Sequence, residues 1–266
     1  MFVFFSLFAS CVSFHKNPAR DNEASVSNRG LSKGSSVEDP DFWDTRPGNG
    51  KLILIGGAAS RTNREEAIRF ALLDAARKIS IFHGVRGLSV SAVSIGEGTY
   101  DFYADAAVDL AFDPEYEKYT EELEFDPETD VLEFDGSVFV RTRWAPPVPF
   151  DVNFPPKGKG RPDWVTNPPE IIDGFLVGIG RSNPYSRPHD TLIASYENAI
   201  GAILNIAGSK VRDGLASVES ADYAASVSSN VQIAEGKLTR FYILEIWTDP
   251  ESRAVWTLSI AKDGGK

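Results

Sequence analysis

The sequence predicts an α+β protein with two tandem repeats, each an amphipathic helix packed on a small antiparallel sheet. Two observations support this prediction. The 266 residues are 42% hydrophobic and 24% charged, which is typical of an ordinary globular protein that can build a core. The chain also aligns with itself at an offset of 124 residues, where 50–56 and 174–180 are both apolar runs that begin and end with glycine.

Both apolar runs lead into a predicted helix. Apolar residues recur there at three- and four-residue spacing, as on the buried face of a helix. The two stripes are Ile68, Leu72, Ala75, Ile79 and Phe82, and Leu192, Tyr196, Ala199, Ile203 and Ile206. Asn63 with Glu66 forms a capping box for the first helix, and Asp190 favours the start of the second. Gly84 and Gly208 are expected to end the helices in a left-handed conformation.

Each repeat is then predicted to end in an antiparallel hairpin. Asp126–Thr129 and Asp249–Ser252 both begin with Asp-Pro, which is favourable turn chemistry. The strand-like runs that flank these turns are 133–144, 241–247 and 254–261. The segments 88–112 and 212–236 mix strand and helix spacing, so neither is assigned.

Proline content separates the repeats. Residues 144–169 hold eight of the sixteen prolines, which indicates a stiff, exposed linker. The predicted organisation is a signal peptide at 1–10, a flexible tether at 11–42, a first repeat at 43–145, a Pro-rich linker at 146–163 and a second repeat at 164–266.

The amino terminus has the pattern of a secretion leader. Residues 1–10 carry no charge and are almost wholly apolar, and a polar stretch follows Cys11. Phe8–Cys11 resembles the lipobox of bacterial lipoproteins, in which the cysteine receives diacylglycerol and an acyl chain such as palmitate. The alternatives are a plain signal peptide with an incidental cysteine and a buried N-terminal helix of a cytosolic protein.

Together with Cys11, two further motifs resemble a known family. Trp164–Pro169 followed by Gly174–Gly180 and an alanine-bearing helix is similar to the small bacterial membrane-associated lipoproteins of the Helicobacter membrane lipoprotein antigen type. The resemblance covers 164–266 closely and the first repeat loosely. It implies outer-membrane attachment, no known catalysis and, in some relatives, a part in disk- or ring-like assemblies around the flagellar motor. Family members carry one such domain, so the tandem duplication is a departure.

The net charge of −11 comes from one segment. Residues 109–135 contain twelve acids and one base, Lys118, and the rest of the chain is balanced. Nucleic-acid binding is therefore not expected, because it depends on Lys and Arg neutralising phosphates. The segment is interpreted as a solvated acidic face or edge. The alternative is a site for a cation or a cationic partner, with Asp126, Glu128 and Asp130 as weak metal candidates.

Few residues point to catalysis. The single cysteine excludes internal disulfides, CxxC redox chemistry, cysteine-ligated zinc and iron–sulfur clusters. The three histidines leave few candidates for metal binding or acid–base catalysis. Gly178 and Gly180 do not form a dinucleotide site, because Asn183 stands at the position of the third glycine. They are expected to let the strand end and turn closely over a helix. His83 is interpreted as a helix-end group. His189 lacks an evident partner in the sequence.

The expected function is that of a lipid-anchored envelope protein that acts through protein interaction or self-assembly, without catalysis or a nucleotide. Its expected location is the periplasmic or surface face of the bacterial outer membrane. The alternative is a module that binds a ligand or cell-wall polymer in a cleft between the two lobes. In that alternative Trp43, Trp144 and Trp164 would stack on sugars, unless they cover their own cores. A third hypothesis is that the protein is a carboxylate-dependent hydrolase.

Overall fold

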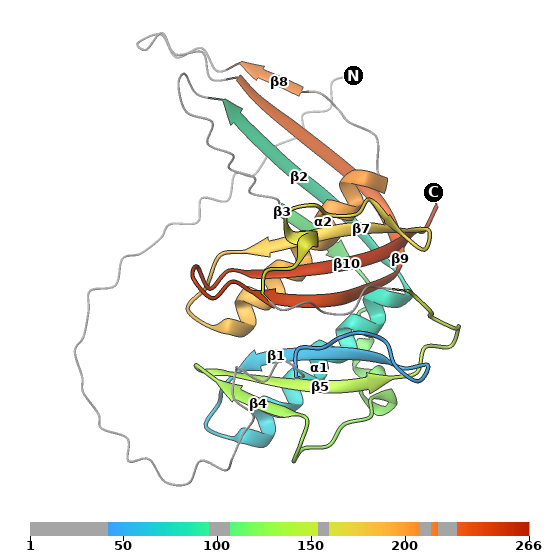
Figure 1. The fold of residues 1–266 in the computed structure, drawn as a ribbon, viewed down its shortest axis with the longest axis vertical. Helices are drawn as coiled ribbons and strands as arrows, with labels where there is room; N and C mark the ends of the chain where they lie inside the picture. The colour runs from blue at the N-terminus through green and yellow to red at the C-terminus, as the bar shows by residue number, and fades with distance from the viewer. Residues whose placement is uncertain (1–41, 96–106, 154–159, 208–213, 218–227, 266) are drawn as a thin grey trace, which may run out of the picture. The chain divides into compact units, whose positions relative to one another are not determined.

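The structure, a computed structural model, describes residues 42–95, 107–153, 160–207, 214–217 and 228–265 (Figure 1). It confirms the α+β class, because α-helices pack on antiparallel sheets. Residues 34–266 form one compact unit. The predicted leader, Cys11 and the tether up to residue 41 lie outside the described residues. Phe42, the last residue of the predicted tether, is buried in the core.

The smaller sheet has three strands in the order β1-β5-β4. These are β1 (Leu52–Ala59), β4 (Val131–Phe134) and β5 (Ser137–Trp144). The hairpin between β4 and β5 turns at Asp135 and Gly136, whose φ angles of 46° and 73° suit a two-residue turn. The prediction of a hairpin turn at Asp126–Thr129 is therefore wrong. That segment makes a local turn before β4, where the Asp130 N–H donates to the Asp126 carbonyl.

The larger sheet has seven strands. Its order is β3-β2-β9-β10-β7-β6, and β8 also pairs with β9. The bounds are β2 (Val85–Ile95), β3 (Ala107–Ala111), β6 (Ile171–Ile172), β7 (Phe175–Ser182), β8 (Gly214–Ser217), β9 (Ser228–Thr248) and β10 (Val255–Asp263). The turn predicted at Asp249–Ser252 does connect β9 to β10, as expected.

This sheet combines strands from both predicted repeats. β2 follows the first helix, yet it pairs along its whole length with β9, from Val85 opposite Leu238 to Ile95 opposite Ser228. We expected each helix to pack on a small sheet of its own, whereas the structure has a sheet that the two predicted repeats share. Backbone groups of an edge strand need partners, and β9 supplies them to β2.

The first helix, α1 (Arg64–His83), packs on β1 and β5. Its start is as predicted, because the Asn63 side chain accepts hydrogen bonds from the backbone N–H groups of Glu65 and Glu66. Its end differs from the prediction. Gly84 has φ 168°, which is extended backbone, so no left-handed residue ends the helix and the chain runs directly into β2.

The second helix, α2 (Pro188–Ala207), packs on β7, β10 and β9. Asp190 lies in its first turn, where a carboxylate favours the positive helix end. Leu192, Tyr196 and Ala199 are buried as predicted. Ile206 is 51% exposed, so the buried stripe ends earlier than the spacing suggested. Gly208 lies outside the described residues.

Each helix passes over a strand at a glycine. A Cβ on Gly56 of β1 would lie 2.0 Å from the Ala71 carbonyl oxygen of α1, and a Cβ on Gly180 of β7 would lie 1.8 Å from the Ser195 carbonyl oxygen of α2. Such distances leave no room for a side chain. The glycines therefore have the packing role expected for Gly178 and Gly180, although they stand inside strands and not at turns.

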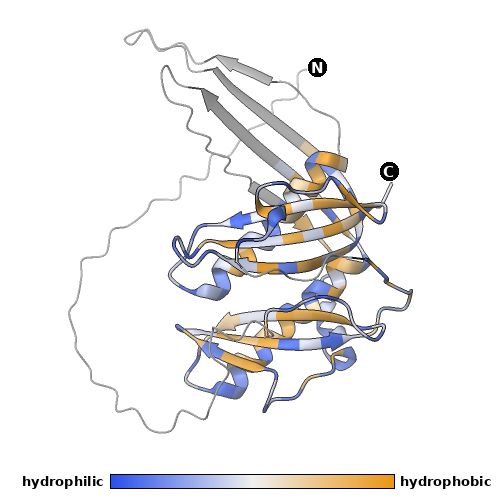
Figure 2. Cartoon of the chain, viewed as in Figure 1, coloured by the Kyte–Doolittle hydropathy of each residue, from blue (hydrophilic) through white to orange (hydrophobic). Residues whose placement is uncertain are grey.

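β1 and β9 belong to different sheets, and a side chain of β9 reaches the backbone of β1. The buried Tyr242 hydroxyl of β9 accepts a hydrogen bond from the Ile53 N–H, at 3.0 Å, and contacts the carbonyl oxygens of Thr45 and Ile53. This side chain links the two sheets through one core. Apolar residues concentrate in the strands and polar residues in the turns (Figure 2).

The predicted linker differs from expectation. Phe150 is buried against Phe82 and Phe175, so the described part of the linker is not simply exposed. The acidic segment, interpreted as a solvated acidic face or edge, contains η1 (Tyr116–Glu122), a 3₁₀ helix without a buried residue. A second 3₁₀ turn, η2 (Asp163–Val165), carries Trp164. Among the described residues, no helix combines the length and apolar character needed to cross a membrane.

Candidate functional site

A pocket of about 520 Å³ lies between 43–145 and 164–266. Its volume falls within the range of about 300–1,000 Å³ that is typical of small-molecule sites. The lining comes from the segment before β1, the β4–β5 hairpin, the start of α2 and the β9–β10 hairpin. The lining residues are Trp43, Phe134, Asp135, Phe139, Pro184, Tyr185, Ser186, Pro188, Thr191, Leu192, Ile246, Trp247, Thr248, Arg253 and Val255.

The apolar part of the pocket rests on a fixed aromatic base. Phe139 is 1% exposed and meets the half-buried Trp43 edge-to-face, with ring centroids 5.0 Å apart. Phe42 also meets Trp43 edge-to-face, with centroids 5.3 Å apart. Leu192 and Ile246 are buried beside this base. The Trp43 ring is thus held in place by its neighbours while it still faces the pocket.

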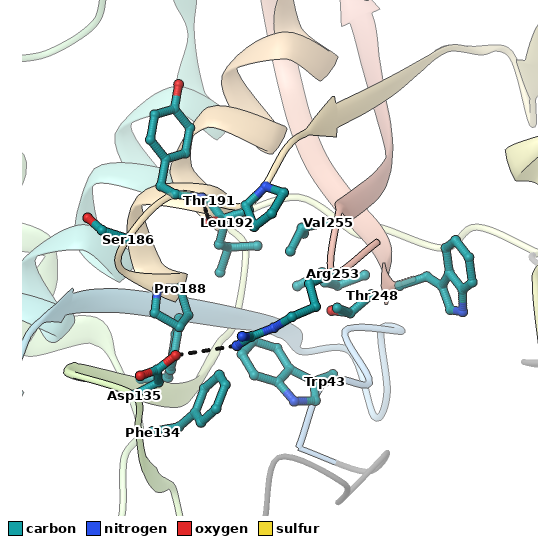
Figure 3. A pocket seen from close by; sticks show the side chains of 15 residues that line it. Trp43, Phe134, Asp135, Ser186, Pro188, Thr191, Leu192, Thr248, Arg253 and Val255 are labelled. Atoms are coloured by element: carbon teal, nitrogen blue, oxygen red, sulfur yellow. Dashed lines mark hydrogen bonds and ion pairs between the residues drawn. The ribbon is translucent and has the colours of Figure 1, made fainter. Parts of the chain in front are cut away.

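Opposite charges meet across the pocket. Arg253 extends from the β9–β10 turn toward Asp135 on the β4–β5 turn, and its Nη2 lies 3.3 Å from the Asp135 Oδ2 (Figure 3). The side chains are 62% and 56% exposed, so the pair contributes little to stability. Both residues have positive φ, 59° and 46°, a conformation that L-residues adopt at a cost and that often occurs at ligand clamps.

The start of α2 forms another wall. Thr191 is buried, and its hydroxyl accepts a hydrogen bond from the Tyr185 N–H at 2.9 Å, which holds the preceding loop against the helix. Pro188 opens the helix, a position where its missing N–H costs nothing. This wall is therefore well ordered by local bonds.

A chain of three side chains lies beneath this wall. The Ser137 Oγ on β5 is 2.9 Å from the His189 Nδ1, and the His189 Nε2 is 3.1 Å from the Asp190 Oδ1. The His189 backbone N–H also donates to the Ser137 Oγ at 3.2 Å. Burial lowers the pKa of His189 below its ordinary value of about 6.5, although Asp190 opposes this shift. The partner that the sequence did not reveal for His189 is therefore Ser137, which is 52 residues away.

The same three residue types occur in Ser-His-Asp hydrolases, but the arrangement differs. Ser137 is fully buried and is not among the pocket-lining residues, so its hydroxyl does not face the pocket. The serine also contacts Nδ1, whereas a catalytic serine contacts the Nε2 of its histidine. We therefore interpret the three residues as a clamp that joins β5 to α2.

The three candidate tryptophans lie in different surroundings. Trp43 lines the pocket. Trp144 is 1% exposed and donates through Nε1 to Glu122 at 2.8 Å, and Trp164 is buried and donates to Glu245 at 2.9 Å. The last two thus cover the core. His83 stacks on Tyr119, with centroids 5.4 Å apart, at the end of α1.

The weak metal candidates bond to their own surroundings. Asp130 is buried and pairs with both guanidinium nitrogens of Arg143, at 2.9 and 3.1 Å. It also accepts from the Asp126 N–H, and Asp126 accepts from the Glu128 N–H. In the described parts of the chain, no three His, Cys, Asp or Glu side chains are grouped as metal ligands.

Most pocket residues were not predicted from the sequence. Asp135 precedes Gly136, a strong two-residue hairpin signal that would have placed it at a turn. Arg253, Thr191 and Trp247 carry no comparable local signal, because their proximity arises from packing between distant segments. Comparisons with known proteins add nothing, since no family model, curated protein or solved structure matches the chain. The resemblance to membrane-associated lipoproteins stays a prediction.

Proposed function

We propose that this protein binds a sugar ring of a cell-wall glycan in the pocket between 43–145 and 164–266, without catalysis. The observation that carries the proposal is the composition of the pocket wall. A fixed aromatic base, Trp43 on Phe139, lines the same pocket as the polar groups of Asp135 and Arg253. For this reason we propose ligand binding, the alternative function from the sequence, in preference to protein interaction.

A sugar ring matches this wall chemically. Its faces carry C–H groups that pack on an aromatic ring, and its rim carries hydroxyls that both donate and accept hydrogen bonds. Asp135 accepts, Arg253 donates, and the hydroxyls of Ser186 and Thr248 do both. The polar groups thus fix the orientation of a ligand that the apolar surface holds.

The charged groups of the pocket also accommodate an uncharged sugar. Arg253 and Asp135 neutralise each other, and they are the charged residues of the pocket wall. Because both side chains are more than half exposed, the pair does not exclude a ligand that carries charges elsewhere. A neutral sugar hydrogen-bonds to both groups while the pair remains intact.

Replacing Trp43 with Ala is expected to weaken binding of chitotriose, an uncharged trimer of N-acetylglucosamine, by about tenfold or more, because the stacking surface is lost. Isothermal titration calorimetry measures the affinity, and a muropeptide tests a cell-wall fragment directly. Trp256→Ala is the matched control, since Trp256 is also partly exposed on the β9–β10 hairpin but does not line the pocket. Absence of chitotriose and muropeptide binding to the native protein would contradict the proposal.

We also propose that the mature protein is anchored to the bacterial outer membrane through lipid on Cys11. The support is the apolar leader and the lipobox-like Phe8–Cys11. Metabolic labelling with a fatty acid is expected to mark the native chain and not Cys11→Ser, and the variant is expected to leave the membrane fraction. A mature chain that begins elsewhere by mass spectrometry would overturn this proposal. Cell-wall glycan would be accessible from an anchored position.

We infer further that one structural unit is used twice in the chain. α1 and α2 have 20 residues each and begin 124 residues apart. The two glycine contacts repeat at the same offset, since Gly56 meets Ala71 and Gly180 meets Ser195. β1 pairs with β5 as β7 pairs with β10, antiparallel in both cases. These correspondences support duplication within a single compact unit.

A further inference from the structure

We propose that His189 makes the pocket pH-sensitive: its neutral ring clamps the start of α2 to β5, and its protonation releases the clamp and lowers ligand affinity. The inference concerns regulation of the pocket and rests on the proposed function for its ligand readout. A second readout, described below, is independent of any ligand.

The clamp connects two walls of the pocket. Ser137 stands between Asp135 and Phe139, which both line the pocket, and His189 follows Pro188, which lines it from α2. His189 also packs over β1, where its Cβ lies 3.0 Å from the position of a Cβ built on Gly57. Separation of Ser137 from His189 would therefore move one wall relative to the other.

The hydrogen bonds determine which nitrogen of His189 carries the proton. Nε2 faces the Asp190 carboxylate, which only accepts, so Nε2 carries the hydrogen. Nδ1 of the neutral ring is then an acceptor, and the Ser137 hydroxyl donates to it. The Ser137 Oγ in turn accepts from the His189 backbone N–H. Both ring nitrogens of the neutral His189 and the Ser137 hydroxyl therefore have partners.

Protonation breaks this pattern. Nδ1 gains a hydrogen and becomes a donor, so the Ser137 hydroxyl can no longer donate to it. Ser137 is fully buried, and its hydroxyl hydrogen would remain without an acceptor in the present arrangement. Positive charge is also unfavourable in the first turn of a helix, where the backbone dipole is positive.

Charged groups from several elements face His189. Asp190, on the same helix, favours protonation, and Arg187 just before the helix opposes it. Asp74 of α1 also favours protonation, but it is paired with Lys78 at 2.5 Å. The effect of burial on the pKa of His189 is larger than the effects of these charges, and it lowers that pKa in the folded protein. As the pH falls, His189 is therefore protonated in the unfolded chain before it is protonated in the folded protein. The stability that the neutral clamp contributes is present above about pH 6.5 and is lost progressively below it.

The experiment measures chitotriose affinity between pH 7.5 and 5.5 by calorimetry. The native protein is expected to bind up to about tenfold more weakly at the lower pH, because protonation leaves one buried hydroxyl unpaired and the lowered pKa of His189 limits the loss at pH 5.5. His189→Asn is expected to bind with the same affinity at both values, because its amide oxygen is as many bonds from Cα as Nδ1 and can accept from Ser137 without titrating. Chitotriose carries no titratable group.

The double variant His15→Asn/His83→Asn is the control, since it removes the other two histidines and should keep the native pH profile. Native affinity that is equal at both pH values, or a pH profile that persists in His189→Asn, would overturn the inference.

Amide hydrogen exchange of the ligand-free protein separates this inference from the proposed function. The His189 N–H is expected to lose up to about tenfold in protection from pH 7.5 to 5.5, after correction for the intrinsic rate, because its acceptor is Ser137. If neither chitotriose nor the muropeptide binds at pH 7.5 but the loss of protection is observed, the proposed function is wrong and the pH-sensitive clamp is still supported. Unchanged protection overturns the clamp whether or not the ligand binds.

Discussion

Replacing Gly180 with Ala is expected to lower the free energy of unfolding by about 3 kcal/mol or more, which is at the upper end for overpacking of a core. The new Cβ would lie 1.8 Å from the Ser195 carbonyl oxygen and 2.7 Å from the Ala199 nitrogen. Both are backbone atoms of α2, so no side-chain rotation relieves the overlap. The helix has to move away from β7 and lose contacts along its buried face.

Urea unfolding of the native and variant proteins measures this effect. Gly56→Ala is expected to cause a comparable loss, since its Cβ would meet the Ala71 oxygen of α1 at 2.0 Å. Gly48→Ala is the control, because no atom lies within 4 Å of its Cβ position, and a change within about 1 kcal/mol is expected. A loss for Gly180→Ala as small as that of the control would show that α2 is not held against β7 as described.

Replacing Asp74 with Ala is expected to destabilise the protein by about 3–5 kcal/mol, because it leaves a buried charge without its partner. Asp74 and Lys78 lie one turn apart on α1, with side chains only 9% and 6% exposed. The Asp74 Oδ2 accepts from the Lys78 Nζ at 2.5 Å and from the Gly57 N–H of β1 at 2.9 Å. Burial lowers the pKa of Lys78 and Asp74 opposes that shift, so removal of the carboxylate removes what keeps the ammonium charged.

A double variant distinguishes an unpaired charge from loss of packing. Asp74→Asn with Lys78→Met removes both charges while it keeps side chains of similar size, and it is expected to be more stable than Asp74→Ala. Denaturant unfolding at pH 7 measures both. Glu133→Gln breaks the exposed pair with Arg64 and should cost less than about 1 kcal/mol. An Asp74→Ala loss no larger than that control would contradict the interpretation of a buried pair.

Helices and close-packed glycines could be predicted because their signals are local. Asn63 caps α1 through bonds to residues two and three positions away, and the apolar stripe of α1 follows helical spacing. The same spacing failed at Ile206, which is exposed. Burial at a helix end depends on what packs there, and a short sequence window contains no information on that.

Strand pairing and the pocket could not be predicted in the same way. β2 has the same local pattern whether it pairs within its own repeat or with β9, 143 residues away between Val90 and Ile233. Trp43 was one of three candidate tryptophans, and nothing in its local sequence separates it from Trp144, which is buried in the core. Ser137 and His189 were each visible in the sequence, but their contact was not.

The sequence by itself determined the α+β class, the presence of both helices and the close approach of Gly178 and Gly180 to a helix, because periodicity, capping and steric size act over a few residues. Only the tertiary structure decided that both halves share one seven-stranded sheet, that Trp43 rather than Trp144 or Trp164 lines a pocket, and that Ser137 bonds to His189. These outcomes depend on which distant backbone groups and side chains satisfy one another in the core, and chain connectivity places few limits on that choice.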